Sequence, residues 1–120
     1  MKAVLLMSHG SRFQKTKEEV LELLGKIARQ CDYDIYEVAF LELESPDIPQ
    51  GIGMCVSKGA TEVVVLLNFL NSGRHVDEDI PRILEETKQQ HPHVKIKMTK
   101  PLGQTSHIAD VFSKILQETV

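Results

Sequence analysis

The sequence predicts an α/β domain in which a four-stranded parallel sheet, with strand order 2-1-3-4, carries helices on both faces. Strand-like and helix-like segments alternate along the 120 residues, as in chains that form parallel sheets. Residues 2–8 and 62–67 are almost continuously apolar, which is typical of central strands buried on both faces. Residues 33–41 and 93–98 alternate polar and apolar side chains, which is typical of edge strands. These patterns predict a three-layer α/β/α arrangement.

The first half of the chain predicts two strands and two helices. The strand at residues 2–8, "KAVLLMS", is followed by a helix over about residues 17–30. Thr16 and Glu19 have the spacing of a capping box at its start. After the strand at residues 33–41, the segment "SPDIPQGIGMCVSKGA" predicts a weaker helix, with Pro46 in its first turn.

The second half predicts the same alternation. The strand at residues 62–67 leads through the loop "NFLNSGRH" to a helix over about residues 76–90, with Pro81 near its first turn. The strand at residues 93–98 follows, and a last helix begins after Ser106. One apolar stripe at helical spacing marks this last helix, formed by Ile108, Val111, Phe112, Ile115 and Leu116.

Composition narrows the classes of partner and compartment. The length predicts a single domain over residues 1–120, and the net charge of −3 disfavours a nucleic-acid partner. No apolar run approaches a membrane span, and the run after Lys2 is too short for a signal peptide. Cys31 and Cys55 fit no CxxC pattern and are interpreted as reduced thiols. We therefore expect a cytoplasmic protein with neither nucleic-acid nor membrane partners.

Two histidines follow the two predicted central strands. His9 comes directly after the first strand, and His75 ends the loop after the third. With order 2-1-3-4, the carboxyl ends of these strands form the switch point where open α/β sheets bind ligands. Two imidazoles there would bind a divalent metal or take up protons near neutral pH. A single histidine in a turn is usually only solvated, and His91, His93 and His107 are interpreted in that way.

Small and basic residues surround both histidines. Glycines permit turns that side chains would obstruct and let a bulky ligand approach, while arginines favour carboxylate or phosphate groups. We expect substrate contacts from Gly10, Ser11, Arg12, Ser72, Gly73 and Arg74.

An acidic segment, "AFLELESPDI", ends the second strand. Glu42 and Glu44 both lie near the same edge, where a carboxylate would accept a proton or orient a histidine. Both also fit solvated loop positions, and the residues alone do not choose between them.

Four segments together resemble the short form of the sirohydrochlorin chelatases. They are "SHGSR", "AFLELESPDIPQGI", "GATEVVVLLNFLNSGRHVDEDIP" and "PLG", and they follow in order along nearly the whole chain. The most specific combination is "GRHVDEDIP" with "SHGSR" and "FLE". The family includes the CbiX-type cobaltochelatases and their nickel- and iron-handling relatives.

The resemblance implies a chelatase-like fold and a lyase that inserts a divalent metal into sirohydrochlorin without ATP, in cobalamin- or sirohaem-type tetrapyrrole biosynthesis. The metal is a substrate, Co2+ first with Ni2+ or Fe2+ as alternatives, and no organic cofactor is implied. His9 and His75 match the family's metal-binding and proton-accepting histidines, and Glu42 matches its mid-chain glutamate. The short members are homodimers.

The chain departs from the family at Asn68, Asn71 and Thr105, where relatives often have proline, apolar residues and a histidine. Two other functions stay open at this point. The same histidines fit a metal- or tetrapyrrole-binding module without turnover. A histidine followed by glycine after the first strand also occurs in histidine phosphatases, although Ser8 stands here where those enzymes have arginine.

Overall fold

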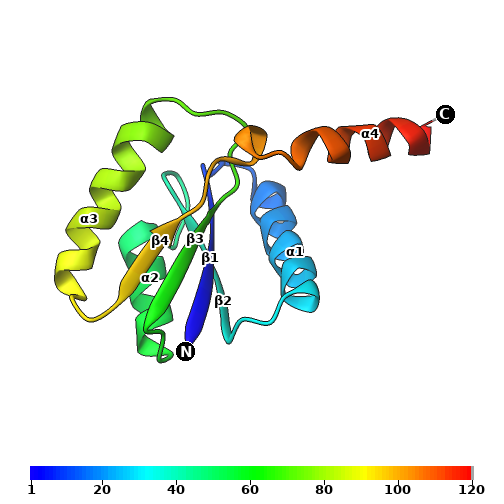
Figure 1. The fold of residues 1–120 in the computed structure, drawn as a ribbon. Coiled ribbons are helices and arrows are strands. Elements are labelled where there is room, and N and C mark those ends of the chain that lie inside the picture. Colours follow the sequence, from blue (N-terminus) through cyan, green and yellow to red (C-terminus); the bar gives the residue numbers. More distant parts are fainter. Residues whose placement is uncertain (120) are drawn as a thin grey trace.

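A computed structural model describes residues 1–119, and it contains the predicted alternation of strands and helices (Figure 1). Its elements are β1 (Lys2–Ser8), α1 (Gln14–Gln30), β2 (Ile35–Phe40), α2 (Ile48–Ser57), β3 (Glu62–Leu67), the π-helical turn η1 (His75–Asp79), α3 (Ile80–Gln90), β4 (Lys95–Met98), the 3-10 turn η2 (Leu102–Gln104) and α4 (Ile108–Thr119). None of these helices is both long enough and apolar enough to cross a bilayer.

The four strands form one parallel sheet with the order β2-β1-β3-β4, which confirms the prediction. Leu6 of β1 pairs with Val38 of β2 on one side and with Leu66 of β3 on the other. All four carboxyl ends therefore lie along the same edge of the sheet. This edge is the upper one in Figure 1.

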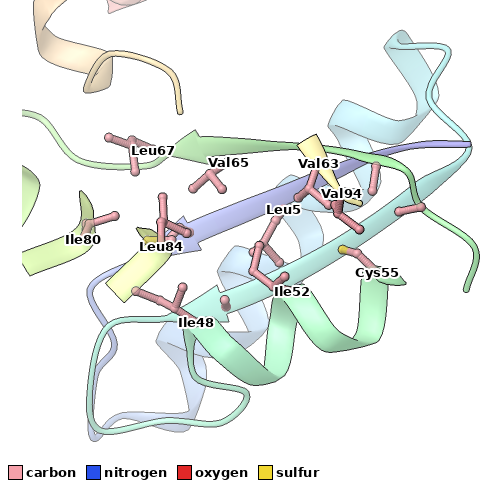
Figure 2. Packing of buried hydrophobic residues seen from close by; sticks show 14 of the residues in the cluster. Leu5, Ile48, Ile52, Cys55, Val63, Val65, Leu67, Ile80, Leu84 and Val94 are labelled. Atoms are coloured by element: carbon pink, nitrogen blue, oxygen red, sulfur yellow. The ribbon is translucent and has the colours of Figure 1, made fainter. Parts of the chain in front are cut away.

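The two faces of the sheet are covered unequally. Helices α2 and α3 pack on one face, where side chains from β1, β3 and both helices form the main core (Figure 2). Leu5, Ile52 and Val65 are fully buried there. Helix α1 covers the other face over β1 and β2, with a smaller cluster of Leu6, Val20, Val38 and Phe40. Helix α4 extends away from the body of the molecule (Figure 1).

Helix α1 begins earlier than predicted, so the prediction of a capping box at Thr16 and Glu19 is wrong. The helix starts at Gln14, Phe13 occupies the N-cap position, and no side chain caps the end. The Phe13 amide is already bonded to the Ser11 hydroxyl at 3.1 Å. This turn starts the helix early and leaves Thr16 within its first turn.

Helix α2 begins later than predicted. Asp47 caps it and Gln50 completes a capping box, while Pro49 rather than Pro46 lies in the first turn. Pro46 instead accepts a hydrogen bond from the Phe40 amide at 2.9 Å through its carbonyl. The edge strands are also shorter than predicted, Ile35–Phe40 against residues 33–41 and Lys95–Met98 against residues 93–98.

Candidate functional site

His9 and His75 lie next to each other at the carboxyl edge of the sheet, with their rings in an edge-to-face arrangement. His9 directly follows β1, and His75 opens η1 after the loop that leaves β3. The centroids of their rings are 5.3 Å apart and the ring planes are inclined at 65°. Phe69 lies on the same side, with its ring centroid 6.5 Å from that of His9. The predicted pairing of these two histidines is therefore confirmed as a geometry.

Backbone contacts between β1 and β2 fix His9. The Leu41 amide donates to the Ser8 carbonyl at 2.9 Å, and the Glu42 amide donates to the His9 carbonyl at 3.0 Å. Gly10 follows with φ +104°, and a Cβ atom there would lie 1.8 Å from the Glu42 carbonyl oxygen. Only glycine fits, because both the backbone angle and the close approach exclude a side chain.

The two candidate glutamates have different partners. The Oε1 atom of Glu42 lies 3.1 Å from Nε2 of His9, and both side chains are about half exposed, 51% and 46%. Glu44 instead accepts a hydrogen bond from the Ser11 amide at 2.7 Å. Glu42 is therefore the carboxylate that contacts the histidine pair, while Glu44 holds the turn after His9.

A carboxylate one helical turn away orients His75. Nδ1 of His75 lies 2.8 Å from Oδ2 of Asp79, so Nε2 is the ring nitrogen that this contact does not use. This contact, with a smaller contribution from Arg82 at 3.5 Å, holds the pKa of Asp79 below its ordinary value. The sequence analysis missed Asp79, although the spacing of four residues from His75 is the signal of such a pair.

His75 was expected in a loop, but it begins a π-helical turn. The Ile80 amide bonds back to the His75 carbonyl, five residues earlier. Pro81 has no N–H, so the ordinary α-helical bond to the Asp77 carbonyl cannot form. A wider turn satisfies the backbone around this proline, and such turns are frequent at functional sites.

Long-range contacts also support the loop before His75. The Asn68 side-chain amide donates to the Ser8 hydroxyl at 3.0 Å and links the ends of β3 and β1. The η2 turn rests on the same loop, because a Cβ atom on Gly103 would lie 1.7 Å from the Leu70 carbonyl oxygen. Sequence reasoning gave neither Asn68 nor Gly103 this role.

The residues predicted to contact the substrate differ in the contacts that they already make. The Ser11 hydroxyl accepts the Phe13 amide and so belongs to its own turn. Arg74 lies 3.6 Å from Glu78 in an exposed pair, and Arg12 and Ser72 are exposed. A Cβ atom on Gly73 would meet nothing within 4 Å, so the expectation that a side chain would obstruct this turn is wrong.

The site offers donor atoms of the kinds that bind a borderline divalent ion. They are two imidazoles, each in contact with one carboxylate. Within residues 1–119, no group of three or more His, Cys, Asp or Glu side chains is gathered closely enough to hold a metal ion by itself.

Comparisons with known proteins identify the relatives of this chain. The chain matches the CbiX family over residues 3–119. It is 35% identical over 120 residues to a sirohydrochlorin cobaltochelatase of Priestia megaterium, covering 99% of this chain and 39% of that protein. It is 32% identical over 119 residues to a sirohydrochlorin ferrochelatase of the same organism, covering 99% of this chain and 45% of that protein.

A solved structure shares the fold over most of the chain. The sirohydrochlorin chelatase SirB from Bacillus subtilis subspecies spizizenii, in complex with cobalt, superposes with a TM-score of 0.87 and 28% identity. The match covers 98% of this chain and 50% of SirB. The chain thus spans about half the length of these relatives or less. On the match over residues 3–119, together with this fold, the chain belongs to the CbiX family.

Proposed function

We propose that this chain inserts a divalent metal ion into sirohydrochlorin, with Co2+ as the first candidate and Fe2+ or Ni2+ as alternatives. The observation that carries the proposal is the pair of facing imidazoles, 5.3 Å apart, each in contact with a carboxylate. The relatives named as cobaltochelatase and ferrochelatase support the substrate and the choice of metals. No organic cofactor enters the proposed reaction.

The histidines would receive the metal ion as a substrate. Neutral imidazole is a good ligand for Co2+, Ni2+ and Fe2+. Asp79 accepts the Nδ1 proton of His75, which fixes the ring and leaves Nε2 as the donor atom. Two half-exposed imidazoles, each beside one carboxylate, would bind the ion loosely enough for it to leave for the four ring nitrogens of the macrocycle.

Insertion also releases two protons, since the ring loses two N–H hydrogens when one divalent ion enters. An imidazole that passes its metal to the ring regains a lone pair, and this lone pair accepts a ring proton. Glu42 contacts Nε2 of His9 and stabilises the imidazolium that results. The charges balance, because one divalent cation replaces two protons.

The basic residues would bind the carboxylates of the substrate. Arg12 and Arg74 are exposed and lie close in sequence to His9 and His75, and they supply positive charge locally in a chain with a net charge of −3. Ser72 and the turns at Gly10 and Gly73 leave room for a flat ring. The Ser11 amide and hydroxyl hold the turn that carries Arg12.

One domain offers only one side of an enclosure for a macrocycle, so we also propose that two copies of the chain form a homodimer. The relatives support this pairing, because SirB is about twice as long as the part that matches. A two-fold axis would bring two copies of the site to one cleft. The free thiols of Cys31 and Cys55 are consistent with a reducing cytoplasm.

The test is a multiple-turnover assay of sirohydrochlorin with Co2+, followed by absorbance of the macrocycle. We expect His9→Ala and His75→Ala each to lower the insertion rate by about 100-fold or more. Glu42→Gln should lower it less, by roughly tenfold. Wild-type rates in both histidine variants would exclude this site as the place of insertion.

His93→Ala is the matched control, because His93 is exposed and lies outside the site. It removes an imidazole without touching the pair and should leave the rate unchanged. If wild-type protein changes the spectrum only once per protein molecule, the chain binds metal or tetrapyrrole without turnover.

A further inference from the structure

Helix α4 carries an apolar stripe that the described residues 1–119 leave largely exposed. None of the residues in Ile108–Thr119 is buried. Phe112 is 54% exposed and Leu116 68%, and Ile108, Val111 and Ile115 continue the same stripe at helical spacing. A contiguous exposed apolar surface of this kind marks an interaction site.

A groove on the α1 face of the sheet has the same apolar character as this stripe. It lies between α1 and β3, has a volume of about 180 Å³, and its lining includes Leu6, Leu23, Ile27, Leu66 and Leu102. Helix α1 covers β1 and β2 on this face, so Val64 and Leu66 of β3 stay only half-buried. The third layer of the fold is therefore incomplete beside α1.

Charge around the groove also complements α4. In the sheet register, Lys95 and Lys97 of β4 pair with Glu62 and Val64, which sets both lysines on the same face as the groove. Lys97 contacts Glu62 at 3.0 Å, while Lys95 is exposed. Glu118 follows Ile115 by three residues and so flanks the apolar stripe of α4. A helix with this stripe and this acid fits beside β4.

The direction of α4 favours a second copy as the occupant. Leu102 already lines the groove, and α4 begins only six residues later but extends away from the body (Figure 1). Docking on its own groove would require the chain to reverse within residues 105–107. A second copy can pack against the stripe without any change in the direction of α4. The share of SirB that the chain covers, 50%, leaves room in that longer protein for a second unit of this size.

We propose that two copies exchange their α4 helices, so that α4 of each copy packs in the α1–β3 groove of the other. Such an exchange is symmetric and buries the stripe twice. The inference rests on the proposed pairing of two copies and names its contact surface. It also ties the interface to the site, because α4 follows η2, and Gly103 of η2 rests on the loop before His75.

The first test compares two double variants by sedimentation without metal or substrate, so its result does not depend on the insertion assay. Phe112→Asp with Leu116→Asp should raise the dimer dissociation constant by roughly 100-fold or more, because it introduces charge into the stripe. Ser113→Asp with Gln117→Asp adds the same two charges to the opposite side of α4 in the same turns. This control should remain as dimeric as the wild-type chain.

A disulfide test separates exchange from docking within one chain. One preparation carries Leu23→Cys, a second carries Phe112→Cys, and both carry Cys31→Ser. Mild oxidation of the mixture should give a disulfide-linked heterodimer. A wild-type monomer, a dimer that survives Phe112→Asp with Leu116→Asp, or a Leu23→Cys/Phe112→Cys chain that closes on itself as a monomer would each overturn the proposal. If the dimer behaves as expected but no insertion occurs, only the proposed function fails.

Discussion

His9 and His75 face each other across one edge of the sheet, but the chain holds them by different means. His9 is fixed by backbone contacts between two strands and by the close approach of Gly10 to Glu42. His75 is fixed locally, by a carboxylate one turn later in its own helix. The loop that leads to His75 depends in turn on a distant segment, η2. The first histidine is therefore held rigidly by the sheet, while the second is carried by an element whose position can be disturbed separately.

Gly10→Ala should have the largest effect on stability and insertion rate, because it disturbs the turn that holds His9 rigidly. The added Cβ atom would lie 1.8 Å from the Glu42 carbonyl oxygen and require φ near +104°. We expect the free energy of unfolding to fall by about 3 kcal/mol and the insertion rate to fall by about 100-fold. Urea denaturation and the insertion assay measure both quantities.

Gly73→Ala is the matched control for Gly10→Ala, since a Cβ atom there meets nothing within 4 Å. It should change the free energy of unfolding by less than about 0.5 kcal/mol. Equal stabilities for the two variants would show that the turn after β1 is not the rigid half of the site.

Gly103→Ala should give the next largest effect, because it tests the distant support of His75. A Cβ atom there would lie 1.7 Å from the Leu70 carbonyl oxygen, so the loop or η2 must move. We expect about 2 kcal/mol of destabilisation and a roughly tenfold slower insertion, while Gln104→Ala, an exposed neighbour, should behave like the wild-type chain. An unchanged insertion rate in Gly103→Ala would mean that η2 does not position His75.

Gly10 and Gly103 also show which parts of the site could be predicted from the sequence. The strand order, and with it the pairing of His9 and His75, could be predicted because apolar runs separate central strands from edge strands. Gly10 lies beside a predicted site residue and so entered the site. Gly103 did not, because its contact with Leu70 spans more than thirty residues and depends on how two loops pack. The π-helical turn at His75 could not be predicted either, since Pro81 suits an ordinary first helical turn equally well.

Asp79→Asn should have a smaller effect on stability than Gly10→Ala and Gly103→Ala do. It removes the charge that orients His75, but it leaves the fold of the chain intact. We expect insertion to slow by roughly tenfold, with the loss in kcat rather than in KM. The same carboxylate gives a signature in stability. Its pKa is lowered in the folded chain, chiefly by the contact with His75, so ionised Asp79 stabilises the fold above its unfolded pKa. That contribution is lost as the pH falls through the lowered folded pKa.

The stability profile therefore checks the role of Asp79 independently of activity. The difference in unfolding free energy between the wild-type chain and Asp79→Asn should be constant near neutral pH and shrink in acid. A difference that stays the same down to acid pH would mean that the carboxylate contact with His75 does not form in solution.

Arg74→Gln and Arg12→Gln should have the smallest effects on the fold, and they ask whether the two sides of the site share the binding of substrate. Arg74 and Glu78 form an exposed pair at 3.6 Å, and such pairs contribute less than about 1 kcal/mol to stability. Both variants should therefore unfold like the wild-type chain.

If the arginines bind the carboxylates of the macrocycle, each variant raises KM for sirohydrochlorin by roughly tenfold at unchanged kcat. Added salt should also raise the KM of the wild-type chain, because it screens the same charges. Arg82→Gln, in the helix α3 that follows η1, removes a contact with Asp79 and should instead lower kcat. An unchanged KM in both Arg12→Gln and Arg74→Gln would remove the arginines from the substrate site.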